Sequence, residues 1–333
     1  MNNRNQLLIK QLKQKILVLD GAMGTMIQQL NLVEEEFRGD LFKNHSHNIE
    51  GNYDILNITQ PEVVKNIHKQ YLEAGADIIE TNTINANSIS QADNGLEDQV
   101  YKINFEGARL ACEVATKYNT SEKPRFVAGS IGPTNQMLSY STGINNLVSK
   151  KISFDMLVDS YYEQIRGLYD GGADIFLIET ICDIQNARAA ISATEKLHSE
   201  TGNTIPIILS ATIDRSGRIL SGQTLEEFYV LLKYSKALSF GLNCSSGAVQ
   251  LKSYVERLSK ISSTFVTVYP NAGLPNELGQ YAQSATEIAK IIEELCSAGL
   301  VNIVGGCCGT TPEYIAVIAN MVYKYKPRKG GVL

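Results

Sequence analysis

The feature that most constrains the fold of this chain is a regular alternation of short β-rich runs with amphipathic helical patterns. The runs are mostly apolar, which is typical of parallel strands that are buried on both faces. We expect strands at Ile16–Leu19, Ala76–Ile79, Arg125–Ala128, Asp174–Ile178, Pro206–Ser210, Leu238–Leu242, Phe265–Val268 and Val301–Val304. Eight strands, each followed by a helix, predict an α/β protein with a single (β/α)8 TIM-barrel domain. A doubly wound open sheet is the alternative, and the lack of a Gly-x-Gly-x-x-Gly turn after a strand disfavours it.

Signals at the ends of helices support this division of the chain. Pro61 opens a helical pattern that ends just before Gly75, and Ser153 is placed as the N-cap of another. Capping boxes, in which a Ser or Thr precedes a Glu by three residues, are expected at Thr224–Glu227 and Ser284–Glu287.

The repeat also sets the expected domain boundaries. Residues 1–14 are predicted to form an N-terminal helical extension, residues 15–325 the barrel, and residues 326–333 a tail or the start of a linker. One long excursion, residues 31–59, interrupts the alternation. Since a long loop inside a compact domain is usually functional, we expect this excursion to lie over one mouth of the barrel.

Composition excludes several classes of protein. Of the 333 residues, 44% are hydrophobic and 20% charged, and the net charge of −5 comes without a clustered basic stripe, so nucleic acid is not the expected partner. No run of eighteen apolar residues predicts a membrane span, and the N-terminus does not resemble a secretory signal. We therefore expect a cytoplasmic protein in a reducing environment, where unpaired cysteines indicate metal binding or catalysis.

Three cysteines follow predicted strands. Cys244 comes after the sixth strand, and Cys307 and Cys308, flanked by glycines, come after the eighth. Adjacent residues on a strand point to opposite faces, so this pair can share one metal only beyond the strand's end. Three sulfurs suit zinc and leave its fourth position open, which is typical of a catalytic site. A disulfide is the alternative for this trio, whereas Cys112 and Cys296 lie inside helical patterns and are interpreted as ordinary buried cysteines.

Acidic and amide residues accompany the same strand ends. Asp20 follows the first strand, Glu80 the second and Glu179 the fourth, and Asn243 precedes Cys244. The carboxyl ends of barrel strands form the face on which active sites are built. Carboxylates there can bind a substrate ammonium group, while a thiol that joins a thiolate-bound zinc ionises and stays nucleophilic. This pattern predicts attack by the thiol of a small amino acid on a methyl group.

The motifs at these strand ends resemble those of the homocysteine S-methyltransferase family, and within it the homocysteine-binding module of cobalamin-dependent methionine synthase. The resemblance runs in order over about residues 16–320. It rests on Asp20-Gly21-Ala22-Met23-Gly24-Thr25, Ile79-Glu80-Thr81-Asn82-Thr83, Gly129-Ser130-Ile131-Gly132-Pro133, Ile178-Glu179-Thr180, Gly241-Leu242-Asn243-Cys244 and Gly305-Gly306-Cys307-Cys308-Gly309-Thr310.

The resemblance implies a zinc barrel that methylates homocysteine to methionine. The implied zinc ligands are Cys244, Cys307 and Cys308. By the same resemblance, Asp20 and Glu179 would contact the homocysteine amino group, and the amides of Gly21 and Ala22 would lie near its carboxylate.

The methyl donor implied by the resemblance is methylcobalamin. The sequence has no Asp-x-His-x-x-Gly cobalamin-binding pattern, so cobalamin-binding and folate-binding modules or proteins are the expected partners. Related enzymes use betaine or S-methylmethionine, and the absence of Trp disfavours a betaine cage without excluding tyrosines. A non-catalytic zinc–thiol sensor module is the alternative from another class.

The remaining candidate residues have more than one interpretation. Glu80 is either a substrate contact or a buried structural acid, and Asn243 is expected to orient loops or the zinc site rather than to react. His45 and His47 could form a metal pair but are read as ordinary loop residues, and Cys182 is a weaker candidate for a reactive thiol near the mouth.

Overall fold

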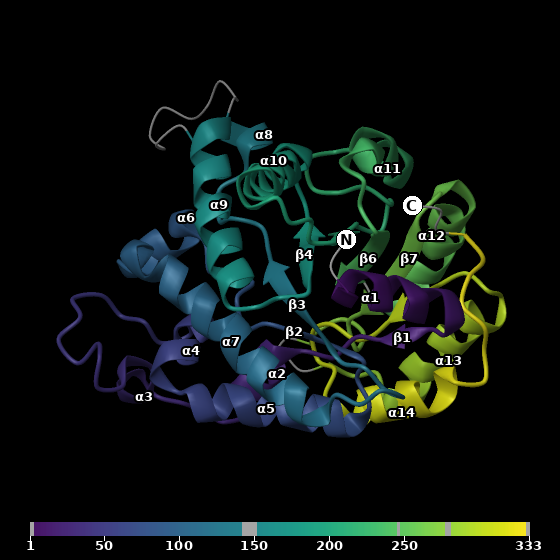
Figure 1. The fold of residues 1–333 in the computed structure, drawn as a ribbon, viewed down its shortest axis with the longest axis horizontal. Helices are drawn as coiled ribbons and strands as arrows, with labels where there is room; N and C mark the ends of the chain where they lie inside the picture. The colour runs from purple at the N-terminus through teal and green to yellow at the C-terminus, as the bar shows by residue number, and fades with distance from the viewer. Residues whose placement is uncertain (1–2, 142–151, 245–246, 277–280, 331–333) are drawn as a thin grey trace.

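The chain folds into a closed ring of parallel strands surrounded by helices (Figure 1), in a computed structural model that describes residues 3–141, 152–244, 247–276 and 281–330. The strands are β1 (Leu17–Val18), β2 (Ile78–Glu80), β3 (Phe126–Ile131), β4 (Ile175–Ile181), β5 (Ile207–Ala211), β6 (Ser239–Cys244), β7 (Phe265–Pro270) and β8 (Ile303–Val304). They pair in the order β1-β8-β7-β6-β5-β4-β3-β2. A parallel bridge between Leu19 and Ile78 joins β1 to β2 and closes the ring. The predicted TIM barrel is confirmed.

Helices follow each strand and cover the outside of the ring. The main ones are α5 (Pro61–Ala74), α7 (Val100–Tyr118), α9 (Phe154–Asp170), α10 (Ile184–Thr201), α11 (Leu225–Leu232), α12 (Ala248–Ile261), α13 (Ala285–Ser297) and α14 (Pro312–Val322). Shorter or additional helices are α1 (Asn3–Gln14), α2 (Met23–Gln28), α3 (Glu34–Arg38), α4 (Leu56–Thr59), α6 (Ser88–Gln91) and α8 (Leu138–Ser141). None of the helices in the described ranges is long and apolar enough to cross a membrane.

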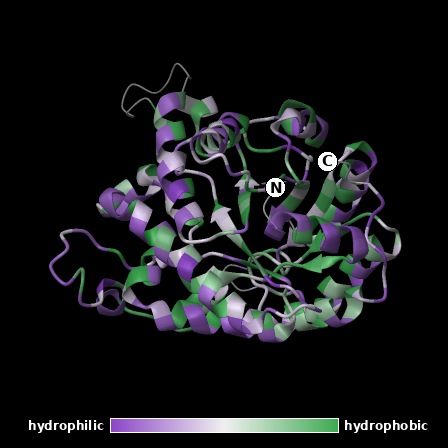
Figure 2. Ribbon diagram, in the orientation of Figure 1, coloured by the Kyte–Doolittle hydropathy of each residue, from purple (hydrophilic) through white to green (hydrophobic). Residues whose placement is uncertain are grey.

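The core has two layers because successive strand residues face opposite sides. Inward-facing residues such as Leu177 and Ile208 form a cluster inside the ring, while outward-facing neighbours such as Phe176 and Leu209 pack beneath the helices. Figure 2 shows strands that are largely hydrophobic and helices with mixed faces, as expected for a sheet covered on its outer face.

Local signals set several helix ends as predicted. Pro61 is at the start of α5, and Gly75 ends it with a left-handed φ of 111°. The Ser153 hydroxyl caps α9 by accepting a hydrogen bond from the Met156 N–H. The capping boxes at Thr224–Glu227 and Ser284–Glu287 are both formed, on α11 and α13.

Helix α1 closes the end of the barrel where the strands begin. Its Leu8 and Leu12 are fully buried and belong to the cluster inside the ring. Arg4 forms a bidentate ion pair with Asp174, just before β4, and also donates to the carbonyl of Arg125. The predicted N-terminal helix therefore plugs the barrel rather than standing apart from it.

The segment predicted to be a tail is also attached to the barrel. The Arg328 guanidinium donates to the carbonyls of Ser259, Ser262 and Thr264 around the end of α12. Its backbone N–H donates to the Val301 carbonyl. These bonds fix the chain at least as far as this arginine.

We predict that Leu12→Ala lowers the free energy of unfolding by about 2–5 kcal/mol, because it leaves a cavity at the closed end of the barrel. Lys10→Ala, on the exposed side of the same helix, is the matched control and should have little effect. Denaturant unfolding of both variants measures the difference. Equal stability of the two variants would show that α1 does not contribute to the core.

Candidate active site

The three cysteines predicted to bind a metal meet at the open mouth of the barrel. The Sγ atom of Cys308 lies 3.9 Å from that of Cys244 and 4.0 Å from that of Cys307. In the part of the chain that the structure describes, they form the one group of three or more His, Cys, Asp and Glu ligand atoms lying within 4.8 Å of one another. All three are free thiols, so a disulfide is not formed.

The sulfur spacing fits a tetrahedral zinc site. Zinc–sulfur bonds of about 2.3 Å in tetrahedral geometry place two sulfurs about 3.8 Å apart. The two short Sγ–Sγ distances of 3.9 and 4.0 Å match this edge length closely. The trio can therefore hold zinc with little rearrangement and leave a fourth position open.

The cysteine pair lies beyond β8, as the shared-metal argument requires. β8 ends at Val304, and the Thr310 N–H donates to the Cys307 carbonyl in a tight turn. Within this turn Gly309 has a φ of 81°, and a Cβ there would lie 2.3 Å from the Tyr281 ring. Glycine is thus required both for the backbone conformation and for the close approach of the tyrosine.

Tyr281 is a site residue that the sequence reasoning missed. Its side chain bonds to Cys308, and hydrogen bonds from Cys244 and Cys307, followed by that from the tyrosine, lower the pKa of Cys308 to about 3. Of the three sulfurs, Cys308 is therefore the one that ionises most readily. Tyr281 lies in a loop, so neither the alternation of a strand nor the periodicity of a helix predicts that it contacts the sulfurs.

The last inward-facing residues of six neighbouring strands form a polar layer above the apolar interior. From β2 to β7 they are Glu80, Ser130, Glu179, Ser210, Asn243 and Tyr269. β4 extends to Ile181, so Glu179 lies within this strand rather than just after it. Asn243 and Cys244 likewise are the last two residues of β6. These strands continue beyond the apolar runs because their last residues still pair with neighbouring strands.

Glu179 is the most strongly held carboxylate of the layer. It is 3% exposed and accepts hydrogen bonds from the hydroxyls of Ser130 at 2.5 Å and Tyr269 at 3.3 Å. Burial raises the pKa of Glu179 to about 7, although these two hydrogen bonds oppose the shift. Ser130 lies in a motif quoted above, whereas only the inward series of β7 indicates Tyr269.

Two further carboxyl groups crowd against Glu179. Burial, and then the charges of Glu179 and Asp20, raise the pKa of Glu80 well above its usual value. Burial also raises the pKa of Asp20, against the hydrogen bonds that its carboxylate accepts from the Glu80 N–H at 3.1 and 3.2 Å. Glu80 Oε1 is buried and has no hydrogen-bond partner among the described residues. The cluster is thus prepared to receive a cation, and its unpaired oxygen favours a ligand contact for Glu80 over a purely structural role.

The backbone after β1 is only partly available to a ligand. The Ala22 N–H donates to the Thr310 carbonyl at 3.1 Å. Gly21 lines the pocket, and a Cβ there would lie 2.8 Å from Thr310 Oγ1 and 2.9 Å from the Tyr71 ring. Of the two amides expected near a substrate carboxylate, that of Ala22 is therefore already occupied.

One large pocket joins these groups. Its volume is about 1020 Å³, and its lining includes Glu80, Glu179 and Cys308 together with Tyr53 and Asp54 from the long excursion. Asp54 is 3% exposed, and burial raises its pKa to about 7. The pocket has room for a second molecule beside a small amino acid.

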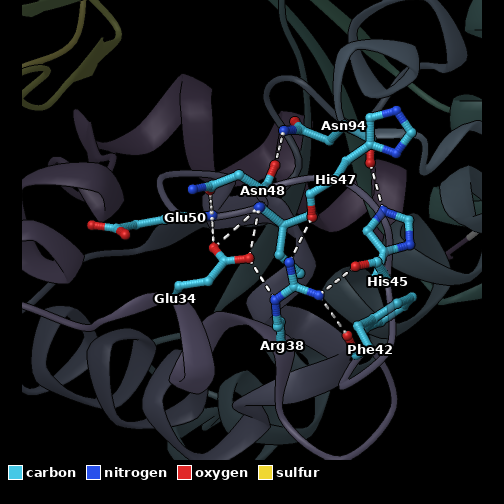
Figure 3. Close-up of polar contacts among 9 residues, drawn as sticks. Glu34, Arg38, Phe42, His45, His47, Asn48, Glu50 and Asn94 are labelled. Atoms are coloured by element: carbon cyan, nitrogen blue, oxygen red, sulfur yellow. Dashed lines mark hydrogen bonds and ion pairs between the residues drawn. The ribbon is translucent and has the colours of Figure 1, made fainter.

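The excursion over residues 31–59 forms one wall of this pocket, as predicted, and carries its own polar core (Figure 3). Arg38 pairs with Glu34 at 2.6 Å and donates to the carbonyls of Phe42, His45 and His47. The Glu34 carboxylate in turn accepts the N–H groups of Ile49 and Glu50. This pair therefore holds the segment that leads into the pocket wall.

The weaker candidates have structural partners. His45 Nε2 bonds to the Asn94 carbonyl at 2.7 Å, and the rings of His45 and His47 lie 5.6 Å apart. Among the described residues, the two histidines do not belong to a group of three or more potential metal ligands. Cys182 contacts the Met137 sulfur, and burial raises the pKa of this thiol. Neither observation favours a metal pair or a reactive thiol.

Comparison with known proteins gives a consistent relationship. Residues 17–322 match the family model described as homocysteine S-methyltransferase. The metallated form of the homocysteine methyltransferase MmuM from Escherichia coli is 23% identical, with a TM-score of 0.71 over 96% of this chain and 99% of that chain. The oxidized form of the same protein has a TM-score of 0.72 at the same identity and coverage. At 23% sequence identity, this structural similarity supports a shared fold and no more.

We predict that Arg38→Ala loosens the pocket wall. The variant loses hydrogen bonds to three carbonyls, each worth about 1 kcal/mol, so local opening should become roughly tenfold or more frequent. Hydrogen exchange of peptides spanning residues 42–50, followed by mass spectrometry, measures this opening. Lys43→Ala is the control, because Lys43 pairs only at the surface with Asp40. Unchanged exchange in Arg38→Ala would rule out the bracing role.

Proposed function

We propose that this chain, which belongs to the homocysteine S-methyltransferase family, uses zinc to transfer a methyl group from methylcobalamin to homocysteine. Family membership makes it a methyltransferase acting on homocysteine. The proposal concerns the metal and the donor. One observation carries it: Cys307 and Cys308 of the cysteine trio line the same pocket at the barrel mouth as the buried carboxyl groups of Glu80 and Glu179.

The proposed zinc ligands are Cys244, Cys307 and Cys308. Support comes from their spacing, from the lowered pKa of Cys308 and from the metallated form in which E. coli MmuM is known. When bound there, zinc would lower the pKa of an added thiol and keep it as a nucleophilic thiolate. A zinc–thiol sensor would need the sulfurs but not the carboxyl groups that accompany them.

The carboxyl cluster is proposed to hold the homocysteine amino group. An ammonium group near Glu80 Oε1 would provide that oxygen with its missing partner and stabilise the ionised forms of Glu179 and Asp20. The Gly21 amide is the proposed contact for the substrate carboxylate. These contacts would direct the thiol toward the sulfur trio and the open part of the pocket.

Methylcobalamin, carried by a cobalamin-binding module or protein, is the proposed donor. The large volume of the pocket supports a donor that enters from outside, and the sequence lacks the cobalamin-binding histidine pattern. A folate-binding partner would then recharge the carrier.

A small cationic donor such as S-methylmethionine or betaine is the second candidate. The observation that favours it is the wall formed by Asp54 with Tyr53, where a buried carboxyl group and an aromatic ring line the same pocket.

We predict one zinc per chain and a loss of zinc in Cys308→Ala, because the variant retains only two sulfur ligands. Metal analysis of the purified proteins measures this. Cys112→Ala is the control, since that cysteine lies on α7 and donates to the Gly172 carbonyl. Undiminished zinc in Cys308→Ala would contradict the assignment of the ligands.

We predict that Glu179→Gln and Asp20→Asn weaken homocysteine binding while zinc remains bound. A charge-assisted contact contributes about 1.5–3 kcal/mol, which corresponds to roughly a tenfold to hundredfold change in affinity. Calorimetric titration measures the change, with Asp93→Asn as a control carboxylate bonded to Asn135 on the excursion side of the pocket. Wild-type affinity in both site variants would place the amino group elsewhere.

The donor is tested by product formation. We expect methionine to form from homocysteine and free methylcobalamin. The reaction should be slow, because free methylcobalamin lacks the entropic advantage of a carrier protein that holds it in position. Methyltetrahydrofolate alone should give none, and a separate cobalamin-binding protein should raise the rate by orders of magnitude. Faster methionine formation from betaine or S-methylmethionine than from methylcobalamin would replace the proposed donor with the second candidate.

A further inference from the structure

Two residues at the site have a backbone conformation that their side chains disfavour. Thr180, next to Glu179, has a φ of 52°, and Cys244 has a φ of 59°. In the described ranges only two other non-glycine residues, Asn31 and Lys236, have positive φ. A left-handed conformation is especially unfavourable for a β-branched threonine, so surrounding contacts must maintain it.

The Thr180 conformation changes the side of the sheet that the β4 residues after Glu179 face. Ile175 and Leu177 face the interior cluster, and Glu179 continues this inward series. Strict alternation would also turn Ile181 inward, yet Ile181 packs in the outer cluster beneath the helices. The pairing with β5 shifts between Ile178 and Ile181, so Thr180 is the extra residue of a β-bulge. The bulge makes Glu179 the last inward side chain of this strand.

The alternation of inward-facing and outward-facing side chains is also broken at the end of β6. Phe240 and Leu242 face outward into the helix-packed cluster, so alternation alone would turn Cys244 outward as well. The left-handed φ of Cys244 instead leaves its sulfur 3.9 Å from that of Cys308.

The Asn243 side chain lies between these two irregular strand ends, at Thr180 and at Cys244. Its Oδ1 accepts the Thr180 N–H at 3.1 Å and the Ser210 hydroxyl at 2.7 Å. Its Nδ2 donates to Thr180 Oγ1 at 2.9 Å and to Cys307 Sγ at 3.9 Å. Asn243 is fully buried and also precedes Cys244 in the chain. The amide of one side chain therefore contacts both β4, which carries Glu179, and the turn after β8, which carries Cys307.

We propose that Asn243 is a positioning residue that couples the amino-acid subsite around Glu179 to the sulfur trio. Its oxygen fixes the bulged Thr180 N–H, and thereby the direction of Glu179. Its nitrogen fixes Cys307, while its own backbone places Cys244. This inference rests on the proposed function, because it assigns ligands to both subsites.

The two ends of the amide can be tested separately. Asn243→Asp keeps an oxygen that can accept the Thr180 N–H but replaces the nitrogen donor with an oxygen beside Cys307. Asn243→Ala removes both ends. Ser239→Ala is the matched control. Ser239 lies on β6, as Asn243 does, but farther from the barrel mouth, and the substitution removes its buried hydrogen bond to Thr267 of β7. Methionine binding to reduced, chelator-treated protein reports the amino-acid subsite, and zinc content of untreated protein reports the sulfur trio.

Asn243→Ala should weaken methionine binding by about tenfold, the loss expected for a broken buried hydrogen bond, and should also lose zinc. Asn243→Asp should lose zinc but bind methionine within about threefold of wild type, because its acceptor remains. Ser239→Ala should change neither measurement. A merely structural residue would not separate the two readouts in this way.

The inference is overturned if Asn243→Ala changes only one readout or neither, or if Asn243→Asp affects both equally. If Asn243→Ala does not fold, the aspartate variant alone decides through its separation of the two readouts. Wild-type protein that binds neither zinc nor methionine would instead overturn the proposed function. The two failures are therefore distinguishable.

Discussion

The polar layer of the site depends on the alternation of side chains along strands that close into a ring. Every second residue of each strand must face the interior, and mostly apolar residues fill that space below the last position. At the mouth, the same geometry brings the end residues of β2 to β7 into one layer, and there they are polar. The barrel thus fixes which strand positions can form a site before any side-chain contact is made.

This arrangement separates stability from chemistry along the barrel axis. At one end, α1 and the ion pair between Arg4 and Asp174 close a dry interior. At the other, buried carboxyl groups lie close together with pKa values raised by burial, an arrangement that costs stability. The packed strands below hold these groups in place, and the excursion braced by Arg38 (Figure 3) forms one wall of the pocket above them.

The sequence carried much of this information because the relevant signals are local. Apolar runs located all eight strands, and the placement of Cys244, Cys307 and Cys308 at strand ends brought the sulfurs together. The bulge at Thr180 and the approach of Tyr281 to Cys308 could not be predicted in this way. Both depend on contacts between residues far apart in the chain, and the same holds for the Thr310 carbonyl that occupies the Ala22 amide.

The unpaired oxygen of Glu80 has a consequence for the fold itself. A buried carboxyl oxygen without a hydrogen-bond partner destabilises the native state, and a ligand that binds only the native state offsets this cost by mass action. With the homocysteine amino group bound there as proposed, the resistance of the protein to unfolding would rise with the homocysteine concentration. The barrel would then be least stable when homocysteine is scarce, and degradation of the protein through its unfolded state would be linked to the supply of its substrate.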